Sequence, residues 1–407
     1  MRYLLCVLIF MSTHAYSEVY RYEYFSKFPF WESPIQPFKF SDPLTRQDAQ
    51  KRIHIQVGYD KNNRIIDVQT RQGDQFKALG NFFDALYVHA VHTKVVYQGD
   101  QEIHQFYNRF GNRTMGWGDI WEKIYTKDER ERYSQMTLLD RLGKPAENSW
   151  GIANYRWKHT LDGSIIEERQ SLAGELKTHR PGFEFERIRL YFDEKGHLRL
   201  MQNIDEALQL IAAKSGASQY SYFYDSKGAF ERWEIYDAKG RPTIGPSNTA
   251  GEFYTIQADG TLAISFFDQT GGPAIHWSGA SNWQLKRDTH GNIIELSYLD
   301  EKNQPTIGHF NFSKISYQWD NKGVNLLSKT LLNPSNKPTL HIDGYSKTQY
   351  FYTPEGLLTE QHFFTIDQKL VVSKYEKAAI IRHQYDNKGL KISTSKHGVK
   401  GELLNEK

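Results

Sequence analysis

The sequence repeats a short turn motif at near-constant intervals, and this repetition limits the possible folds more than any other feature. The segments 224–228 (YDSKG) and 385–389 (YDNKG) are nearly identical. Close copies are 192–196 (FDEKG) and 319–323 (WDNKG), and more divergent copies also end in glycine. Successive motifs lie 31 to 33 residues apart, with their glycines at positions 163, 196, 228, 260, 291, 323, 356 and 389. A fixed period of this length indicates tandem structural repeats.

Each motif is typical of a tight turn between two β-strands. An aromatic residue ends the first strand, an aspartate or asparagine accepts hydrogen bonds from nearby backbone N–H groups, and glycine adopts the positive φ that the turn requires. A repeated calcium site would need several oxygen ligands per turn, whereas most turns here offer one aspartate. We therefore predict structural roles for five turn pairs: Asp193 with Gly196, Asp225 with Gly228, Asp288 with Gly291, Asp320 with Gly323, and Asp386 with Gly389.

A second strand and a second turn follow each motif. Segments such as 229–236 (AFERWEIY) and 292–299 (NIIELSYL) have the length and partial alternation of strands. They are followed by 237–242 (DAKGRP) and its counterparts, where proline removes a backbone donor as strand pairing ends. Aromatic residues make up 14% of the chain, which suits half-buried sheets. The predicted fold class is all-β, an elongated array of antiparallel β-hairpin repeats of about 32 residues, either open or solenoid-like.

The regularity of the motifs sets the expected boundaries. Residues 135–395 hold the regular repeats. Residues 52–134 hold degenerate repeats, in which copies of the turn motif such as 59–63 (YDKNN) lack the glycine. Residues 18–51 carry four prolines among aromatic residues, so we expect an extended cap segment that covers a bare sheet edge. Residues 396–407 are polar, and we expect them to form a frayed tail.

The N-terminus has the features of a secretory signal peptide. Residues 4–11 (LLCVLIFM) form a short apolar run, and Ala15 and Ser17 stand at the small-residue positions of a cleavage site. The run is shorter than the roughly 20 apolar residues that span a bilayer. We therefore predict a signal peptide over 1–17, a periplasmic or secreted location, and no transmembrane segment in the mature chain. Cys6, the only cysteine, lies in the segment removed, so the mature chain would hold no disulfide.

At its YDxxG motifs the chain resembles bacterial YD repeats of the RHS class and, more loosely, WG-type and MORN-type repeats. All of these are short β-hairpin units in tandem, and the resemblance covers about two thirds of the chain. It implies a β-repeat scaffold that interacts with another protein or with cell-surface material. The period is longer than the usual YD unit and no toxin domain accompanies the array, so a closed RHS-like shell does not follow.

The sequence offers few residues with recognisable chemistry. It contains no HExxH, P-loop or GxSxG motif, and we predict no catalytic, cofactor-binding or metal-binding residues. A net charge of +3 without a basic cluster argues against nucleic-acid binding. His276, Trp277 and Trp283 are the candidate binding residues, because neighbouring aromatic rings could stack against a sugar or a peptide. The alternative is that these rings pack against the adjacent repeat.

These observations lead to one principal functional hypothesis and two alternatives. The principal hypothesis is an exported, non-catalytic binding or scaffold protein that presents its repeat surface to a protein partner, as an immunity-type or envelope interaction protein would. The first alternative is a repeat protein that binds glycan or peptidoglycan through exposed aromatic residues. The second is an enzyme with an atypical site in the irregular region before residue 150.

Overall fold

The computed structural model describes residues 18–30, 32–78, 90–116, 118, 120–178, 180 and 182–404. The predicted signal peptide over 1–17 lies outside the described residues. Across these ranges, we find no helix with the length and apolar character needed to cross a membrane.

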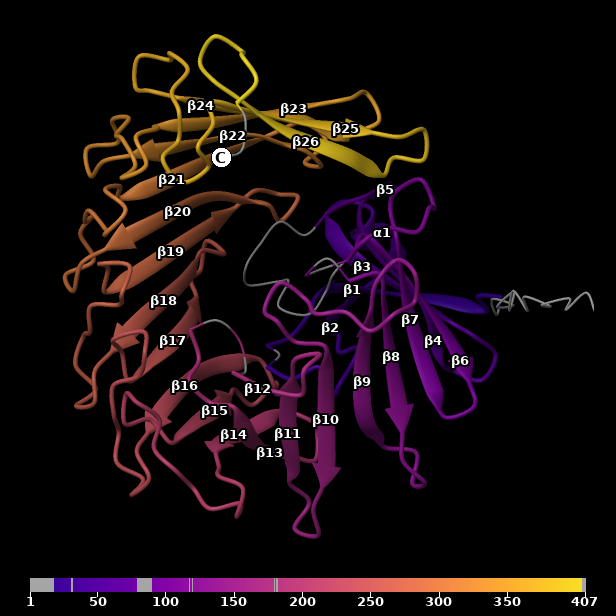
Figure 1. The fold of residues 1–407 in the computed structure, drawn as a ribbon. Helices are drawn as coiled ribbons and strands as arrows, with labels where there is room; N and C mark the ends of the chain where they lie inside the picture. The colour runs from indigo at the N-terminus through magenta and orange to yellow at the C-terminus, as the bar shows by residue number, and fades with distance from the viewer. Residues whose placement is uncertain are drawn as a thin grey trace, which may run out of the picture.

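The structure confirms the predicted all-β class. The described strands form one sheet of 26 strands with antiparallel pairing between chain neighbours. In Figure 1 the strands follow one another around a curve, from β6–β10 on the right through β13–β16 at the bottom to β23–β26 at the top. The sheet is open. Its last strand, β26, pairs with β25, and its first strands, β1 to β3, pair with one another, so among the described residues no strand pairing joins the two ends.

The strands are short and follow one another at regular intervals. The first nine are β1 (Arg21–Lys27), β2 (Ser41–Leu44), β3 (Ile53–Tyr59), β4 (Ile65–Gln72), β5 (Gln75–Phe76), β6 (His92–Gln98), β7 (Gln101–Tyr107), β8 (Glu122–Lys127) and β9 (Tyr133–Leu139). The next nine are β10 (Asn154–His159), β11 (Ile165–Gln170), β12 (Leu176–Lys177), β13 (Arg187–Phe192), β14 (Leu198–Asn203), β15 (Gln219–Tyr224), β16 (Phe230–Tyr236), β17 (Gly251–Ile256) and β18 (Leu262–Phe267). The last eight are β19 (Asn282–Arg287), β20 (Ile293–Leu299), β21 (Lys314–Trp319), β22 (Leu326–Leu332), β23 (Lys347–Tyr352), β24 (Leu358–Phe364), β25 (Ile380–Tyr385) and β26 (Lys391–His397).

The YDxxG motif forms the first turn of each repeat, between the two strands of a hairpin. In the turn between β15 and β16, Asp225 Oδ1 accepts the backbone N–H groups of Lys227 at 2.9 Å and Ala229 at 2.8 Å. Gly228 has a φ of 84° and donates its N–H to the Asp225 carbonyl. The aspartate thus satisfies backbone donors that the turn would otherwise leave without a protein partner. The other four predicted pairs have the same hydrogen bond from glycine N–H to aspartate carbonyl, at Gly196–Asp193, Gly291–Asp288, Gly323–Asp320 and Gly389–Asp386.

The same turn geometry forms where the motif has lost its glycine. Asp60 Oδ1 accepts the N–H groups of Asn62 and Arg64, both at 2.9 Å, and Asn63 takes the positive φ of 62°. The turn that begins at Asp128 has the corresponding hydrogen bonds, with Glu131 at a φ of 59°. The degenerate motifs at Asp60 and Asp128 therefore form hairpin turns with the same local hydrogen bonding.

The repeats between β14 and β25 each contain a third turn that the sequence analysis did not anticipate. After β16 and its second turn, the return segment bridges back through Pro242 to Tyr236. The chain then turns at Gly245, whose N–H donates to the Thr249 carbonyl at 2.9 Å, with Asn248 at a φ of 62°. In other repeats histidine or alanine replaces the first glycine of this turn, as at His276, so no fixed motif marks it.

The two faces of the sheet differ in polarity because side chains alternate along each strand. In the β15–β16 hairpin, Tyr220 lies opposite Ile235, and Tyr222 lies opposite Trp233. These side chains belong to a buried core cluster on one face of the sheet. Ser221 and Glu234 are opposite each other on the other face. Six such clusters follow the array, so the core is a series of local packings between neighbouring repeats among the described residues.

The N-terminal segment both caps the sheet edge and crosses its apolar face. β1 pairs with β2 and β3 at the start of the sheet, and α1 (Arg46–Ala49) follows. Between β1 and β2, residues 28–30 and 32–40 pass over strands far along the chain. The Phe30 ring stacks on Phe230 with centroids 3.8 Å apart, and the Tyr125 hydroxyl donates to the Pro34 carbonyl at 3.0 Å. This segment therefore contributes directly to the core.

Backbone carbonyls in the first turns of the later repeats accept hydrogen bonds from the N-terminal repeats. These bonds run from Ile53 N to His290 O at 2.8 Å, Lys77 Nζ to Gly323 O at 2.5 Å, Arg109 Nη1 to Glu355 O at 2.8 Å, and Asn108 Nδ2 to Lys388 O at 2.9 Å. In Figure 1 the strands β23–β26 accordingly lie near α1 and β5. The curve of the array is thus held by contacts between residues that are more than 200 positions apart in sequence.

The C-terminal residues fold back instead of leaving the sheet as the expected frayed tail. Gly398 N–H donates to the Glu402 carbonyl at 2.9 Å, and Gly401 N–H donates to the Gly398 carbonyl at 3.0 Å. Leu404 N–H then donates to the Lys396 carbonyl at 2.8 Å. Residues 398–404 therefore form the second turn and return segment of a last repeat, and residues 405–407 lie outside the described residues.

Candidate functional site

The structure does not bring the three candidate binding residues to one exposed patch. His276 is 4% exposed, and its ring stacks on Phe266 with centroids 4.4 Å apart. Trp283 is half-buried on β19 and donates its Nε1–H to Ser278 Oγ at 3.1 Å. Trp277 is 50% exposed. His276 and Trp283 are therefore core residues of their repeat, and Trp277 alone of the three is available for binding.

Burial also fixes the charge state of His276. Desolvation lowers the pKa of its imidazole to about 4, so the ring is neutral at pH 7. Its Nδ1 lies 3.0 Å from Ser278 Oγ and accepts the Ser278 backbone N–H at 3.2 Å. The histidine thus shapes the third turn by bonding within it, as Asp225 shapes a first turn.

Trp277 belongs to a row of exposed apolar side chains that we call the third-turn stripe. Strand-like alternation in the return segment explains the row, because Ala274 is buried and the next residue points outward. Equivalent positions in consecutive repeats are likewise exposed. The stripe has side chains between 38% and 59% exposed, and it consists of Ile275, Trp277, Ile307, Leu340, Ile342 and Val372.

Hydrogen bonds between successive third turns hold the stripe in place. Asn248 Nδ2 donates to the Ile275 carbonyl, and Asn311 Nδ2 donates to the Leu340 carbonyl, each at 2.8 Å. The Trp277 ring lies edge-on to Phe310 in the following repeat, with centroids 5.8 Å apart. Since these bonds link neighbouring repeats, the exposed side chains are presented by ordered backbone. Exposed apolar side chains gathered along one edge are typical of interaction surfaces.

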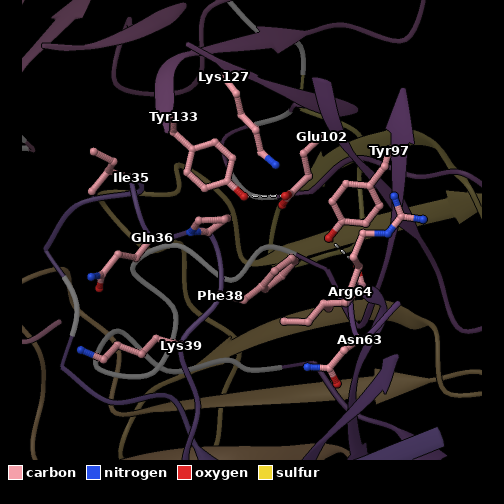
Figure 2. A pocket seen from close by; sticks show the side chains of 12 residues that line it. Ile35, Gln36, Phe38, Lys39, Asn63, Arg64, Tyr97, Glu102, Lys127 and Tyr133 are labelled. Carbon is pink, nitrogen blue, oxygen red and sulfur yellow. Dashed lines mark hydrogen bonds between the residues drawn. The ribbon is translucent and has the colours of Figure 1, made fainter. Parts of the chain in front are cut away.

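A second candidate site is a cleft of about 570 Å³ beside the N-terminal segment, which we call the N-terminal cleft. Residues 35–39 form one wall, and residues 63–65 from the turn between β3 and β4 form another. Figure 2 shows Tyr133, Glu102 and Tyr97 along the opposite side, with the Phe38 ring facing them. The size is within the range of small-molecule sites.

Glu102 is the acidic residue of this cleft. It is 3% exposed, its Oε1 lies 2.7 Å from His104 Nε2, and its Oε2 accepts the Tyr133 hydroxyl at 2.5 Å. Burial acts to raise the pKa of the carboxyl, but the hydrogen bonds from His104 and Tyr133 outweigh it and lower that pKa. Burial lowers the pKa of the His104 imidazole. The pair is therefore an anionic glutamate held by a neutral histidine.

Three basic side chains line the same cleft. Lys39 Nζ donates to the Gly196 carbonyl at 2.6 Å, and burial lowers the pKa of its ammonium although Asp193 acts the other way. The guanidinium of Arg64 lies 4.5 Å from the centre of the Tyr97 ring. Lys127 is the third. The cleft thus combines aromatic walls with more positive than negative side chains.

Sequence reasoning identified only Trp277 of the stripe and no residue of the cleft, and the reasons differ between the two sites. The stripe depends on the third turn, whose residues vary from repeat to repeat. The cleft forms where residues 35–39 cross strands that are distant in sequence. A signal for the stripe does exist, since an aliphatic residue follows two positions after the proline at 273, 305 and 338. Its recurrence at the repeat period would have indicated a common structural position.

Comparison with known proteins identifies no family for this chain and finds only distant structural neighbours. No family of known proteins and no curated protein matches the sequence. A crystal structure of TcdB2-TccC3 is 12% identical over 85% of this chain, with a TM-score of 0.28, and a Photorhabdus luminescens Tc holotoxin pore is 12% identical over 84%, with a TM-score of 0.25. This chain covers only 20% and 22% of those chains. The likeness is too low to carry an argument about function, and the chain's own structure is that of a tandem β-hairpin repeat protein.

Proposed function

We propose that the chain is an exported, non-catalytic scaffold that binds a protein partner through the third-turn stripe. The observation that carries this proposal is the recurrence of half-exposed aliphatic side chains at equivalent positions, from Ile275 through Ile307 and Leu340 to Val372. Burying such side chains against a partner is favourable by roughly 25 cal/mol for each Å² of apolar surface removed from water. The periplasmic or secreted location rests on the apolar run near the start of the sequence.

The spacing of the stripe favours a helical partner segment. Each repeat adds two strands about 4.8 Å apart, so equivalent side chains recur about every 10 Å. Two turns of an α-helix advance about 10.8 Å and return a side chain to nearly the same face. In an extended peptide, about every third residue would lie beside a stripe side chain. Because side chains alternate along an extended chain, every second one of these residues would point away from the stripe. An amphipathic helix laid along the stripe fits the periodicity better.

The side chains that line the N-terminal cleft are suited to binding a ligand. Glu102 is the one carboxylate among the described residues that line it, and His104 lies behind Phe38, with ring centroids 4.6 Å apart. A hydrolytic site of the glycosidase kind needs two carboxyl groups at a defined separation. The lining offers binding groups in place of such a pair.

Two acidic substitutions in the stripe test the proposal. We expect Ile307→Asp with Leu340→Asp to reduce partner binding at least tenfold, because charged groups replace apolar contacts at two adjacent repeats. The wild-type chain is used to capture proteins from periplasmic extract, the captured protein is identified and purified, and its affinity for wild type and variant is measured by calorimetry.

The matched control is Leu161→Asp. Leu161 is fully exposed in the turn between β10 and β11, away from the stripe, so its substitution replaces an exposed aliphatic side chain by one aspartate, half the charge added in the double variant, without touching the proposed surface. Retained binding by this control together with loss in the double variant supports the stripe. Equal affinity of the double variant and wild type for the purified partner would exclude it.

A further inference from the structure

The N-terminal cleft presents aromatic rings that are fixed before any ligand arrives. The Tyr97 hydroxyl donates to the Ile65 carbonyl at 3.0 Å, and the Tyr133 hydroxyl is tied to Glu102. Phe38 stacks on His104 with an interplanar angle of 13°. Figure 2 shows the three rings around one open space. Rings immobilised in this way lose little conformational freedom on binding, and their faces match the apolar faces of sugar rings.

Polar groups stand between these rings at positions suited to hydroxyl groups. The Glu102 carboxylate accepts hydrogen bonds, which sugar hydroxyls donate. The side-chain amides of Gln36 and Asn63, which both line the cleft, can donate and accept. A mixture of aromatic faces, amides and a carboxylate is better matched to a polyhydroxylated ring than to an aliphatic ligand.

The charge of the lining selects further among sugars. Lys39 has a backbone carbonyl as its hydrogen-bond partner, and a carbonyl does not neutralise an ammonium charge. Lys127 lies 3.5 Å from Glu131, whose side chain is 80% exposed and therefore strongly screened by water. Arg64 is paired with Asp60 at 2.8 Å. The anionic Glu102 acts on Lys127 and Asp193 acts on Lys39, so the charge of each lysine is partly offset. The lining still holds three basic side chains against one carboxylate, and an anionic ligand would offset this excess.

We propose that the N-terminal cleft binds an anionic saccharide unit, a sugar ring that carries a carboxylate or phosphate group. The ring lies among Phe38, Tyr97 and Tyr133, and its acidic group lies toward Lys127, with Lys39 on another side of the cleft. A volume of about 570 Å³ accommodates one or two sugar units. The cleft and the third-turn stripe are formed by different repeats, so this inference does not depend on the proposed protein partner.

Calorimetry with four probes tests the inference on the purified full-length chain. The probes are glucuronic acid, glucose 6-phosphate, glucose and inorganic phosphate. We expect the two acidic sugars to bind at least tenfold more tightly than glucose and than phosphate, with affinity that falls as salt is added. Glucose binding as tightly as glucuronic acid would overturn the charge selection. Phosphate binding as tightly as glucose 6-phosphate would overturn the role of the sugar ring, and no binding of any probe would overturn the site.

Variants locate the binding in the cleft. We expect Lys39→Met with Lys127→Met to weaken the binding of both acidic sugars at least tenfold and to leave the affinity for glucose unchanged. Lys127→Gln alone is the milder variant, expected to lose at least threefold. The matched control is Lys286→Met, which removes an exposed lysine that is paired with Glu295 and does not line the cleft. Unchanged affinity in both cleft variants, with urea midpoints equal to wild type, would contradict the assignment.

Discussion

Replacing Arg169 with alanine is expected to lower the free energy of unfolding by about 3–5 kcal/mol. Arg169 and Glu167 are both fully buried, and their charged atoms lie 2.9 Å apart. Arg169 also donates to the Glu186 carbonyl at 3.0 Å, while Glu167 accepts the Trp157 indole N–H at 2.8 Å. Removing the guanidinium leaves the Glu167 carboxylate buried without its ion-pair partner, and this uncompensated charge causes most of the loss. Urea denaturation followed by tryptophan fluorescence measures the effect.

The control for this prediction is Arg241→Ala. Arg241 pairs with Asp237 at 2.7 Å, but its side chain is 69% exposed, so the expected loss is at most about 1 kcal/mol. Replacing Glu167 by glutamine and Arg169 by methionine together removes both charges and should recover part of the stability lost with Arg169→Ala alone. If Arg169→Ala costs no more than Arg241→Ala, the buried pair does not have the role assigned to it.

Substituting Gly251 with alanine should destabilise the protein by about 3 kcal/mol, although the glycine belongs to no turn motif. Gly251 begins β17, and a Cβ atom there would lie 2.2 Å from the Trp233 carbonyl oxygen and 2.3 Å from the Phe267 ring. A backbone carbonyl in a paired strand cannot move aside without breaking the ladder. We expect a lower urea midpoint with an unchanged m-value, since the unfolded chain exposes the same surface.

Gly271→Ala separates this packing effect from backbone strain. Gly271 has a φ of 82°, and a Cβ atom there would meet nothing within 4 Å. The alanine therefore costs only the left-handed conformation, about 1 kcal/mol. A loss at Gly251 as small as that at Gly271 would show that β16, β17 and β18 are not packed as closely as described.

The sequence was sufficient for features that depend on a few adjacent residues. Asp225 and Gly228 define their turn through bonds that span four residues, so the motif alone predicts the hairpin. The periodicity of these turns then predicts an antiparallel array. Turns that lack glycine are harder to recognise in the sequence, because Asn63 and Glu131 adopt the positive φ without a conspicuous sequence signal.

Features that depend on the curvature of the sheet could not be predicted in the same way. The stacking of Phe30 on Phe230 joins residues 200 positions apart, and no local pattern specifies it. The placement of His276 inside and Trp277 outside depends on a third turn with variable residues. Both candidate sites arise from such long-range or weakly marked features, which is why the predicted aromatic cluster included one residue of the stripe and none of the cleft.

The curvature also explains how one array can carry two separate surfaces. The third turns lie on one edge and keep their apolar residues in a row across repeats. The first turns direct their backbone carbonyls toward the N-terminal repeats, where Gly196 accepts from Gln36 and Lys39 beside the cleft. A change that straightened the array would therefore disrupt the cleft before it disrupted the stripe.

The most direct test of this account is chemical cross-linking between Asn108 and Lys388. Asn108 Nδ2 donates to the Lys388 carbonyl at 2.9 Å across 280 residues. Cysteines are placed at both positions, with Cys6 replaced by serine, and a short bismaleimide is added under native conditions. Lys227 occupies the same turn position as Lys388 in an earlier repeat, so Asn108→Cys with Lys227→Cys is the control. The account predicts an intramolecular cross-link for the first pair and none for the control, and equal yields for the two pairs would contradict it.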